Sequence, residues 1–163
     1  MKPPCLAQAR WSSPLGEITL ATTATGLAGL WFDGQKHHPG PLDAPQDPAH
    51  PFIVQAIDEL TRYFNGTLRH FSVPLDLHGT PFQRQVWQAL QAIAPGATSS
   101  YAGIAQALGN PQACRAAGTA IGRNPVSIIV PCHRVLGRDG SLTGYAGGLD
   151  RKAALLKLEQ PSA

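Results

Sequence analysis

Apolar and polar residues alternate along residues 9–32, and turns that contain glycine, at 14–16 and at Gly26, interrupt the alternation. Alternation bounded by glycine and proline is typical of strands joined by short turns. The pattern therefore predicts an antiparallel meander in residues 9–32. The short apolar segment 73–77 is expected to add a strand to this meander.

A helical spacing begins after the proline-rich segment 33–51, which we interpret as a surface loop. Apolar side chains in residues 52–65 are three or four positions apart: Ile53, Ile57, Leu60 and Phe64. This spacing places them on one face of an amphipathic helix, which Gly66 is expected to end. A further helix is expected from Gly79-Thr80-Pro81, because threonine caps helices and proline suits their first turn.

Two short helices are predicted next, at 101–108 and at 112–121, with the turn Gly109-Asn110-Pro111 between them. This arrangement indicates a helix-turn-helix, although the same pattern also occurs as ordinary packing. The inward stripe of the second helix is expected to hold Ala113, Ala116, Ala117, Ala120 and Ile121. Arg115 lies on a different face, among glycines. Small residues would let this face approach a surface closely, with Arg115 as a projecting wedge.

The segment Ile128-Ile129-Val130 is a run of β-formers, which predicts a buried strand that ends at Pro131 and Cys132. His133 follows directly. A thiol is a strong nucleophile only as thiolate, and a neighbouring imidazole can generate that form. The pair alone is equally compatible with a buried structural cysteine beside a core histidine.

Composition limits the class of protein. The 163 residues allow one domain or two small ones that share a core, and no apolar run approaches the length of a membrane span. Three cysteines without paired spacing argue against a disulfide framework, so a reducing cytoplasm is the expected location. The net charge of +3 permits nucleic-acid binding without demonstrating it.

Metal binding is not expected. His37, His38 and His50 lie in the loop at 33–51, but no cysteine or carboxylate spacing supports a metal site there. Cys5 is too isolated to change this. We therefore expect neither a metal nor a cofactor.

The motif Pro131-Cys132-His133-Arg134-Val135, preceded by Asn124-Pro125, resembles the O6-alkylguanine-DNA alkyltransferases. The resemblance covers roughly residues 79–160. Further motifs occur in the order and spacing of the family: Gly79-Thr80-Pro81-Phe82-Gln83, Val86-Trp87, Ser100-Tyr101, Cys114-Arg115-Ala116-Ala117-Gly118 and Gly144-Tyr145-Ala146-Gly147-Gly148.

The resemblance implies an α+β fold in two parts. Residues 1–78 would form a ribonuclease-H-like α/β domain with an antiparallel sheet. Residues 79–163 would form a mainly helical DNA-binding and alkyl-acceptor domain with the helix-turn-helix. The implied activity is repair of DNA: Cys132 takes the alkyl group from O6-alkylguanine in one irreversible SN2 step, and the protein reacts once.

Five residues would carry the chemistry in the family. Cys132 is the nucleophile, and His133 acts on it through a water. Glu159 polarises His133, Asn124 orders the turn around Cys132, and Tyr145 donates to O6 of the flipped base. Val135, Ala146 and Ser127 would line the base pocket.

The resemblance also implies how DNA binds. The second helix of the helix-turn-helix would enter the minor groove of double-stranded DNA, with Ala113, Cys114, Ala116 and Gly118 at the contact. Arg115 would intercalate where the base is flipped out, and Tyr101 would press on the phosphate. A monomer is expected. Cooperative binding along DNA, the range of alkyl groups and activity on O4-alkylthymine stay open.

The neighbouring sequence supports the role implied for Glu159, because Leu155 and Leu156 lie four and three residues before it. It therefore borders an apolar stripe, where a carboxylate needs a partner. A surface glutamate at a frayed helix end is the alternative. Two alternatives concern function: a module that only recognises alkylated DNA, and a cysteine hydrolase or redox protein. The family motifs around Asn124 and Arg115 argue against the latter, and Cys132 argues against the former.

Overall fold

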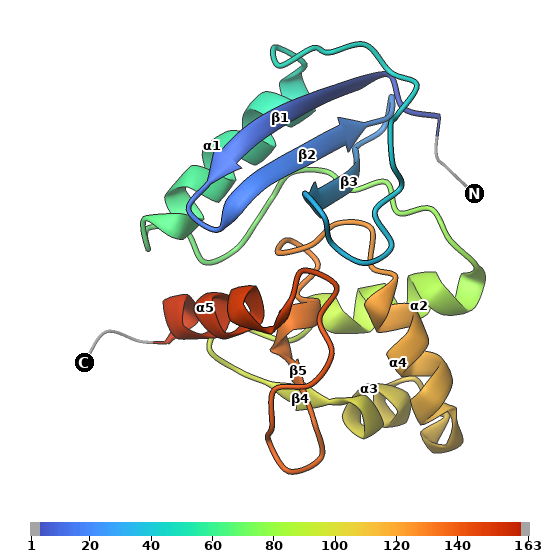
Figure 1. Cartoon of the computed structure of the whole chain (residues 1–163). Coiled ribbons are helices and arrows are strands. Elements are labelled where there is room, and N and C mark those ends of the chain that lie inside the picture. The colour runs from blue at the N-terminus through green and yellow to red at the C-terminus, as the bar shows by residue number, and fades with distance from the viewer. Residues whose placement is uncertain (1–3, 161–163) are drawn as a thin grey trace.

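The computed structural model describes residues 4–160 (Figure 1). The N-terminal part is a three-stranded antiparallel sheet in the order β1-β2-β3, formed by β1 Ala7–Ser13, β2 Gly16–Thr22 and β3 Leu27–Phe32. The predicted meander is thus confirmed. Trp11 pairs with Ile18, and Ile18 pairs with Phe32, so alternate side chains of the strands point to the same face.

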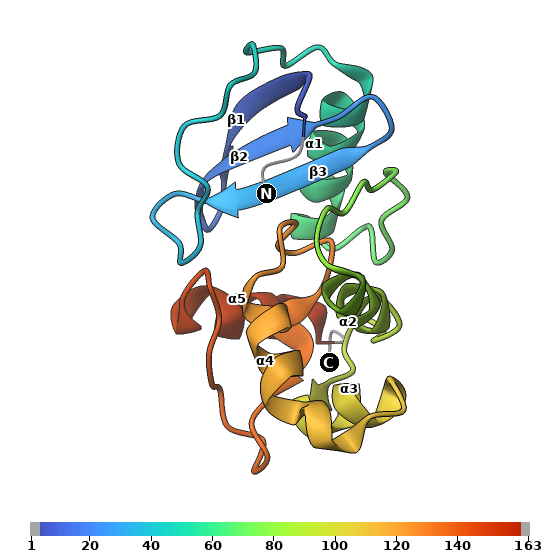
Figure 2. The ribbon, with the colours of Figure 1, turned by 90° about the vertical axis from the view of Figure 1, so that its right-hand side faces the viewer.

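Helix α1, Pro51–Phe64, covers one face of this sheet (Figures 1 and 2). It begins where His50 Nδ1 accepts a hydrogen bond from the Phe52 amide. It ends at Asn65, and Gly66 follows in the left-handed conformation at φ +78°. The fully buried side chains of Ile53 and Leu60 pack toward the strands, as the helical spacing predicted.

The C-terminal part is mainly helical (Figure 1). Its elements are α2 Pro81–Gln91, β4 Ser99–Ser100, α3 Tyr101–Ala107, α4 Cys114–Gly122, β5 Val135–Leu136 and α5 Leu149–Glu159, with 3-10 turns at Pro111–Ala113 and Cys132–Arg134. Strands β4 and β5 pair in parallel. Thr80 and Gln83 form a capping box at the start of α2, which confirms the predicted cap. The expected α+β fold is confirmed.

Three sequence predictions are wrong in detail. Residues 73–77 form no strand: Leu75 makes an isolated bridge with Leu27, and the neighbouring Pro74 has no amide to donate. The run 128–130 is a turn, and Ile128 has a left-handed φ of +72°. The second helix of the helix-turn-helix starts with a 3-10 turn at Pro111–Ala113, so α4 itself begins at Cys114.

The two parts share one hydrophobic core. The amide of Leu30 in β3 donates to Pro125 O at 2.8 Å, and Leu30 forms an isolated bridge with Val126. Arg151 at the start of α5 donates to Leu15 O at 2.9 Å, and its guanidinium lies 4.4 Å from the centre of the Phe32 ring. These contacts fix the C-terminal part against the lower edge of the sheet, as both views show (Figures 1 and 2). Within residues 4–160, no helix is long and apolar enough to cross a membrane.

Candidate active site

Cys132 lies at the start of the 3-10 turn Cys132–Arg134, directly after Pro131. Its side chain is buried, with 5% of its surface exposed. Asn124, also buried, donates from Nδ2 to Cys132 Sγ at 3.1 Å and to Val130 O at 2.8 Å. The Asn124 Oδ1 atom accepts from the Val126 amide at 3.0 Å. One amide side chain therefore holds both ends of the turn that presents the thiol.

The apolar residues between Asn124 and Cys132 form a turn instead of a strand because contacts outside the run hold them in that shape. Ile128 is fully buried and has φ +72°, a conformation that costs a β-branched residue energy. The surrounding contacts determine this shape: Val126 bonds Asn124 on one side and bridges β3 on the other. The apolar run therefore buries itself as a turn packed under the sheet, and it delivers Cys132 at the end.

Glu159, the last residue of α5, is the centre of a buried polar cluster. Its Oε2 atom lies 2.7 Å from His133 Nε2, and both side chains are almost completely buried. Arg134 donates from Nε to Oε1 and from an Nη atom to Oε2, both at 2.8 Å. Tyr63 of α1 donates to Oε2 at 2.6 Å. The alternative of a frayed surface glutamate is therefore wrong.

The donors around Glu159 determine its charge. Burial would raise its pKa, but hydrogen bonds from His133 and Arg134, with a further one from Tyr63, outweigh burial and hold the pKa at about 2. The carboxylate is thus ionised at neutral pH and accepts a hydrogen bond from His133 Nε2–H. His133 Nδ1 is left as a buried acceptor with no hydrogen-bond partner among the described residues.

The shifted pKa values of His133 and Cys132 leave both side chains uncharged at neutral pH. Burial lowers the pKa of His133, and Glu159 only partly opposes this, so the imidazole is neutral at pH 7. Burial raises the pKa of Cys132 to about 11, while the hydrogen bond from Asn124 and the charge of Lys152 partly oppose it. The thiol is therefore protonated and needs a base before it can act as a nucleophile.

A cavity of about 500 Å³ opens at Cys132, between α4, the segment 144–149 and the loop after β3. Its lining includes Tyr101, Arg123, Cys132, Tyr145 and Ala146. The expected pocket residues Val135 and Ser127 are buried and are not part of this lining. Burial raises the pKa of Tyr145, and the nearby Ser127 partly opposes this effect.

Tyr145 has its hydroxyl buried at the cavity, without a hydrogen-bond partner among the described residues. The loop that carries it is held through its carbonyl groups. Lys152, fully buried, donates to Thr143 O at 2.6 Å, and Arg151 donates to Gly147 O at 3.0 Å. A side chain at Gly147 would meet the Tyr145 ring at 2.7 Å, so glycine is required for this packing.

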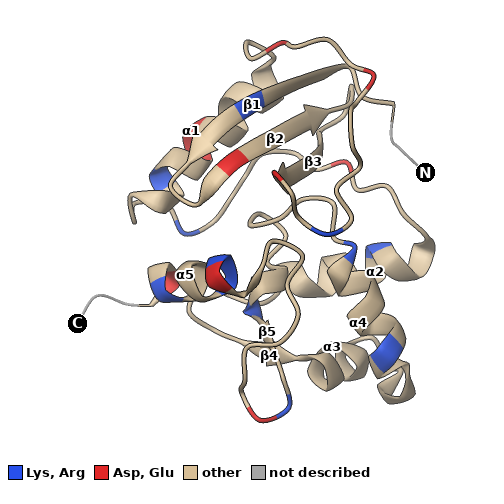
Figure 3. Cartoon of the chain, viewed as in Figure 1, with Lys and Arg blue, Asp and Glu red and all other residues tan. Residues whose placement is uncertain are grey.

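The helices α3 and α4 of the helix-turn-helix lie beside each other (Figure 2), and Tyr101, Gly118 and Gly122 from them line the cavity. Tyr101 begins α3, packs its ring beside Gly118 of α4 and donates to Thr143 O at 3.3 Å. Arg115 is exposed on α4 (Figure 3 shows the basic residues). Ala113 and Cys114 are half-buried.

The inward stripe predicted for the second helix is confirmed only in part. Ala117, Ala120 and Ile121 are buried, but Ala116 is exposed and joins the face that carries Arg115. Ala113 lies in the 3-10 turn before α4 and is only half-buried. Trp87 of α2 holds α4 in place by donating from Nε1 to Ala120 O at 2.8 Å.

Sequence reasoning did not find several residues of the site. Tyr63 belongs to the amphipathic helix α1 in the other half of the chain, and no sequence spacing linked it to Glu159. Arg134 stands in the motif but gave no sign of burial. The sequence likewise gave no sign that Lys152 is buried. The loop after β3 contributes Lys36 and His37 to the cavity, where composition indicated only a surface loop. No group of His, Cys, Asp or Glu in residues 4–160 could hold a metal ion.

A buried thiol supported by a histidine and a carboxylate, at the edge of a cavity beside a helix-turn-helix, defines a class of DNA-binding proteins that react through one cysteine. Residues 81–161 match the family described as 6-O-methylguanine DNA methyltransferase, DNA binding domain, and residues 8–77 match its ribonuclease-like domain. The chain belongs to the 6-O-methylguanine DNA methyltransferase family.

Individual relatives agree with this assignment. A methylated-DNA--protein-cysteine methyltransferase from Mycobacterium tuberculosis is 48% identical over 151 residues, which cover 93% of this chain and 90% of the relative. One from Methanosarcina barkeri is 48% identical over 149 residues, 91% of this chain and 93% of the relative. The crystal structure of Mycobacterium tuberculosis OGT in complex with DNA has a TM-score of 0.89 and 46% identity, and the match covers 95% of this chain and 93% of that one.

Proposed function

We propose that this protein repairs DNA by moving the alkyl group of O6-alkylguanine onto its own Cys132. The observation that carries the proposal is the buried Cys132 thiol at the cavity, followed directly by His133, which is hydrogen-bonded to Glu159. The family and its relatives, which are methylated-DNA--protein-cysteine methyltransferases, support this activity.

The proton of the thiol would pass to His133. Because Glu159 accepts from Nε2–H, the free lone pair of His133 is on Nδ1, and a water could carry the proton from Cys132 to it. Arg134 and Tyr63 would keep Glu159 ionised during this transfer. Asn124 stabilises the developing thiolate through its donor to Sγ.

The flipped guanine would lie in the cavity at Cys132. Tyr145 is suited to donate its buried hydroxyl to O6, and the Ala146 amide is a second donor at the same wall. The carbonyl groups of Cys132 and Val135 would accept from the exocyclic amine. Ser127 would support Tyr145 from behind instead of touching the base.

The thiolate attacks the alkyl carbon in an SN2 displacement. A C–S bond forms, the C–O6 bond breaks, and its electron pair leaves with guanine, which takes up the proton lost by the thiol. The product is a thioether on Cys132. A thioether is a stable product, and no part of this step restores the thiol, so each molecule would react once.

DNA would bind as a duplex, with α4 in the minor groove. Exposed Arg115 and Ala116, with the half-buried Ala113, Cys114 and Gly118, provide the contact face. Arg115 would fill the space left by the flipped nucleotide, and Tyr101 at the cavity edge would press on its phosphate.

We further propose residues 1–78 and 79–163 as the two structural parts, whose extreme ends lie outside the described residues. A monomer in the reducing cytoplasm is the form we propose for the active protein, since its function needs a free thiol. Whether copies bind DNA cooperatively would be read from the shape of a binding isotherm.

Mass spectrometry after incubation with a duplex that contains O6-methylguanine tests the proposed function. We expect one added methyl per molecule on Cys132, none in Cys132→Ala, and normal transfer in the control Cys114→Ala. A protein that binds the damaged duplex but gains no mass would be a recognition module. Several demethylated duplexes per protein molecule would indicate a hydrolytic or otherwise regenerating enzyme.

A further inference from the structure

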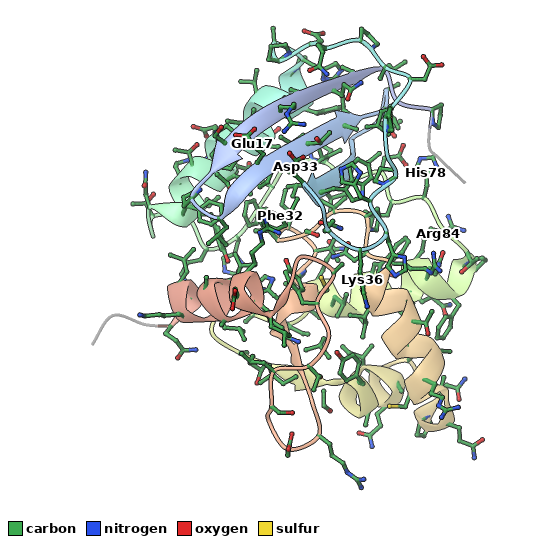
Figure 4. The ribbon with its side chains drawn as sticks, in the orientation of Figure 1. Glu17, Phe32, Asp33, Lys36, His78 and Arg84 are labelled. Carbon is green, nitrogen blue, oxygen red and sulfur yellow. The ribbon has the colours of Figure 1, made fainter. Side chains whose placement is uncertain are left out.

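The loop between β3 and α1 reaches from the N-terminal part to the cavity in the C-terminal part. Lys36 and His37 of this loop line the cavity together with Cys132 and Tyr145. Figure 4 shows Lys36 below the sheet, at the level of the top of α4. The site is therefore built from both halves of the chain, although the sequence motifs all lie in the second half.

The loop is fixed where it meets the cavity. The Lys36 amide donates to Ala146 O at 3.0 Å, which ties the loop to the segment that carries Tyr145. Gln35, with 7% of its surface exposed, accepts from the Phe32 amide at 2.8 Å and donates to Lys36 O at 3.2 Å. The backbone of Lys36 is thus held on both sides, while its side chain is exposed.

His37 has an unusual backbone for a residue with a side chain. Its φ is +60°, in the left-handed region, which is uncommon outside glycine and costs energy. In this conformation the exposed His37 turns along the cavity wall with Lys36. Strained backbone conformations of this kind cluster at functional sites.

The charges at the cavity have one sign. Lys36 and Arg123 are the ionised residues of its lining, and the lining contains no carboxylate. The nearest acidic residue in the loop, Asp33, pairs with Arg10 at 2.5 Å. Neither Lys36 nor Arg123 makes an ion pair in the part of the chain that the structure describes. The entrance is therefore suited to an anion.

We propose that Lys36, which lines the cavity together with His37, binds a phosphate of the DNA strand whose nucleotide enters the cavity. This inference rests on the proposed function and extends the DNA-contacting surface from α4 to the N-terminal part. A base can reach Cys132 only if its own backbone follows to the cavity entrance, and the phosphodiester is the anionic group that must then lie there. Lysine on a fixed backbone provides a flexible point charge for it.

The test compares Lys36→Gln with Lys36→Arg and with Lys157→Gln, which removes an exposed lysine of α5 outside the cavity lining. The first measurement is the affinity for a duplex that contains O6-methylguanine, at several salt concentrations. Each variant is made in the unreactive Cys132→Ala background, and Cys132→Ala alone is the reference. Loss of one phosphate contact should reduce the slope of log affinity against log salt by about 0.9 and weaken binding roughly three- to tenfold at low salt. Lys36→Arg should keep most of the affinity, and Lys157→Gln should match the reference.

The second measurement is the ratio of the alkyl-transfer rate on duplex DNA to the rate on free O6-benzylguanine. We expect this ratio to fall in Lys36→Gln and to keep its wild-type value in Lys157→Gln. An unchanged slope and ratio in Lys36→Gln would overturn the inference while leaving alkyl transfer intact. A wild-type protein that transfers no alkyl group would instead overturn the proposed function, whereas the salt slope would still decide on the phosphate contact.

Discussion

Tyr63 of α1 donates a 2.6 Å hydrogen bond to Oε2 of Glu159, a residue that lies 96 positions further along the chain. The N-terminal part therefore completes the polar cluster behind Cys132. Glu159 Oε2 accepts from Tyr63, His133 and Arg134 together, and all of these groups are buried.

Tyr63→Phe should destabilise the protein, because it removes a donor from a buried carboxylate. A hydrogen bond to a charged group is worth about 1.5–3 kcal/mol, and we expect a loss of that size in the free energy of unfolding. Chemical denaturation measures it. Tyr101→Phe is the matched control: its hydroxyl makes a longer bond of 3.3 Å at a half-exposed site, so the loss should stay below about 1 kcal/mol. Equal losses would mean that the Tyr63 hydroxyl does not support Glu159.

The low pKa of Glu159 makes stability depend on acid pH. Its pKa is about 2 in the folded protein against a model-compound value of 4.5, so its contribution is fully present above pH 4.5 and is lost as pH falls toward 2. The difference corresponds to about 3 kcal/mol. The free energies of unfolding of the wild type and Glu159→Gln should be measured from pH 7 to pH 2. The difference between the two proteins should shrink by about this amount as the pH falls.

At neutral pH, Glu159→Gln should cost stability as well as activity, because Arg134 would remain buried with its charge unpaired. Breaking a buried pair in this way costs about 3–5 kcal/mol. Activity measurements on this variant need a check that the protein is folded. A difference in the free energy of unfolding that stays constant at every pH would instead show that Glu159 has the same pKa in the folded and unfolded states.

His133→Gln should change how the reaction rate depends on pH. Under the proposed mechanism, neutral His133 takes the thiol proton in the wild type, so the rate with free O6-benzylguanine should be nearly constant from pH 7 to 9. Without this base, only spontaneous thiolate reacts. Since the pKa of Cys132 is about 11, the rate should be low at pH 7 and rise about tenfold per pH unit.

A matched control for this experiment is His78→Gln, which alters a half-exposed histidine paired with Asp76 outside the cavity lining. Its pH profile should follow the wild type. A steep rise already present in the wild type would remove His133 from the proton path.

Arg115→Ala should slow repair of duplex DNA much more than reaction with the free base. Extrusion of a nucleotide costs a few kcal/mol, and a free base needs no extrusion. The expected loss on duplex is roughly tenfold to a hundredfold, which corresponds to about 1.4–2.8 kcal/mol. Arg62→Ala, at an exposed arginine of α1, serves as control. Equal losses on both substrates would place Arg115 in the chemistry or the fold.

Local patterns predicted those elements that local contacts determine. The spacing of Ile53 and Leu60 defined α1, and the Thr80 cap defined the start of α2, because both depend on residues a few positions apart. The position of Glu159 beside Leu155 indicated its burial for the same reason. The family motifs supplied the other site residues that the sequence analysis named.

Long-range contacts explain what the sequence did not reveal. Residues 128–130 have the composition of a strand, but Asn124 and the bridge from Val126 to Leu30 hold them in a turn. Tyr63 reaches Glu159 only after the two parts of the chain pack together. Lys36 reaches the cavity through a bond to Ala146, 110 residues away, and no periodicity records such a contact.

The position of Glu159 also has a consequence for a chain that is still being synthesised. A ribosome makes Cys132 before it makes α5, and the partners of Glu159 in α1 and in the turn at Cys132–Arg134 already exist when α5 emerges. Until then His133 has no carboxylate to orient it. The nascent protein thus carries Cys132 before it carries the carboxylate that orients His133, and under the proposed mechanism the thiol gains its base only in the folded molecule.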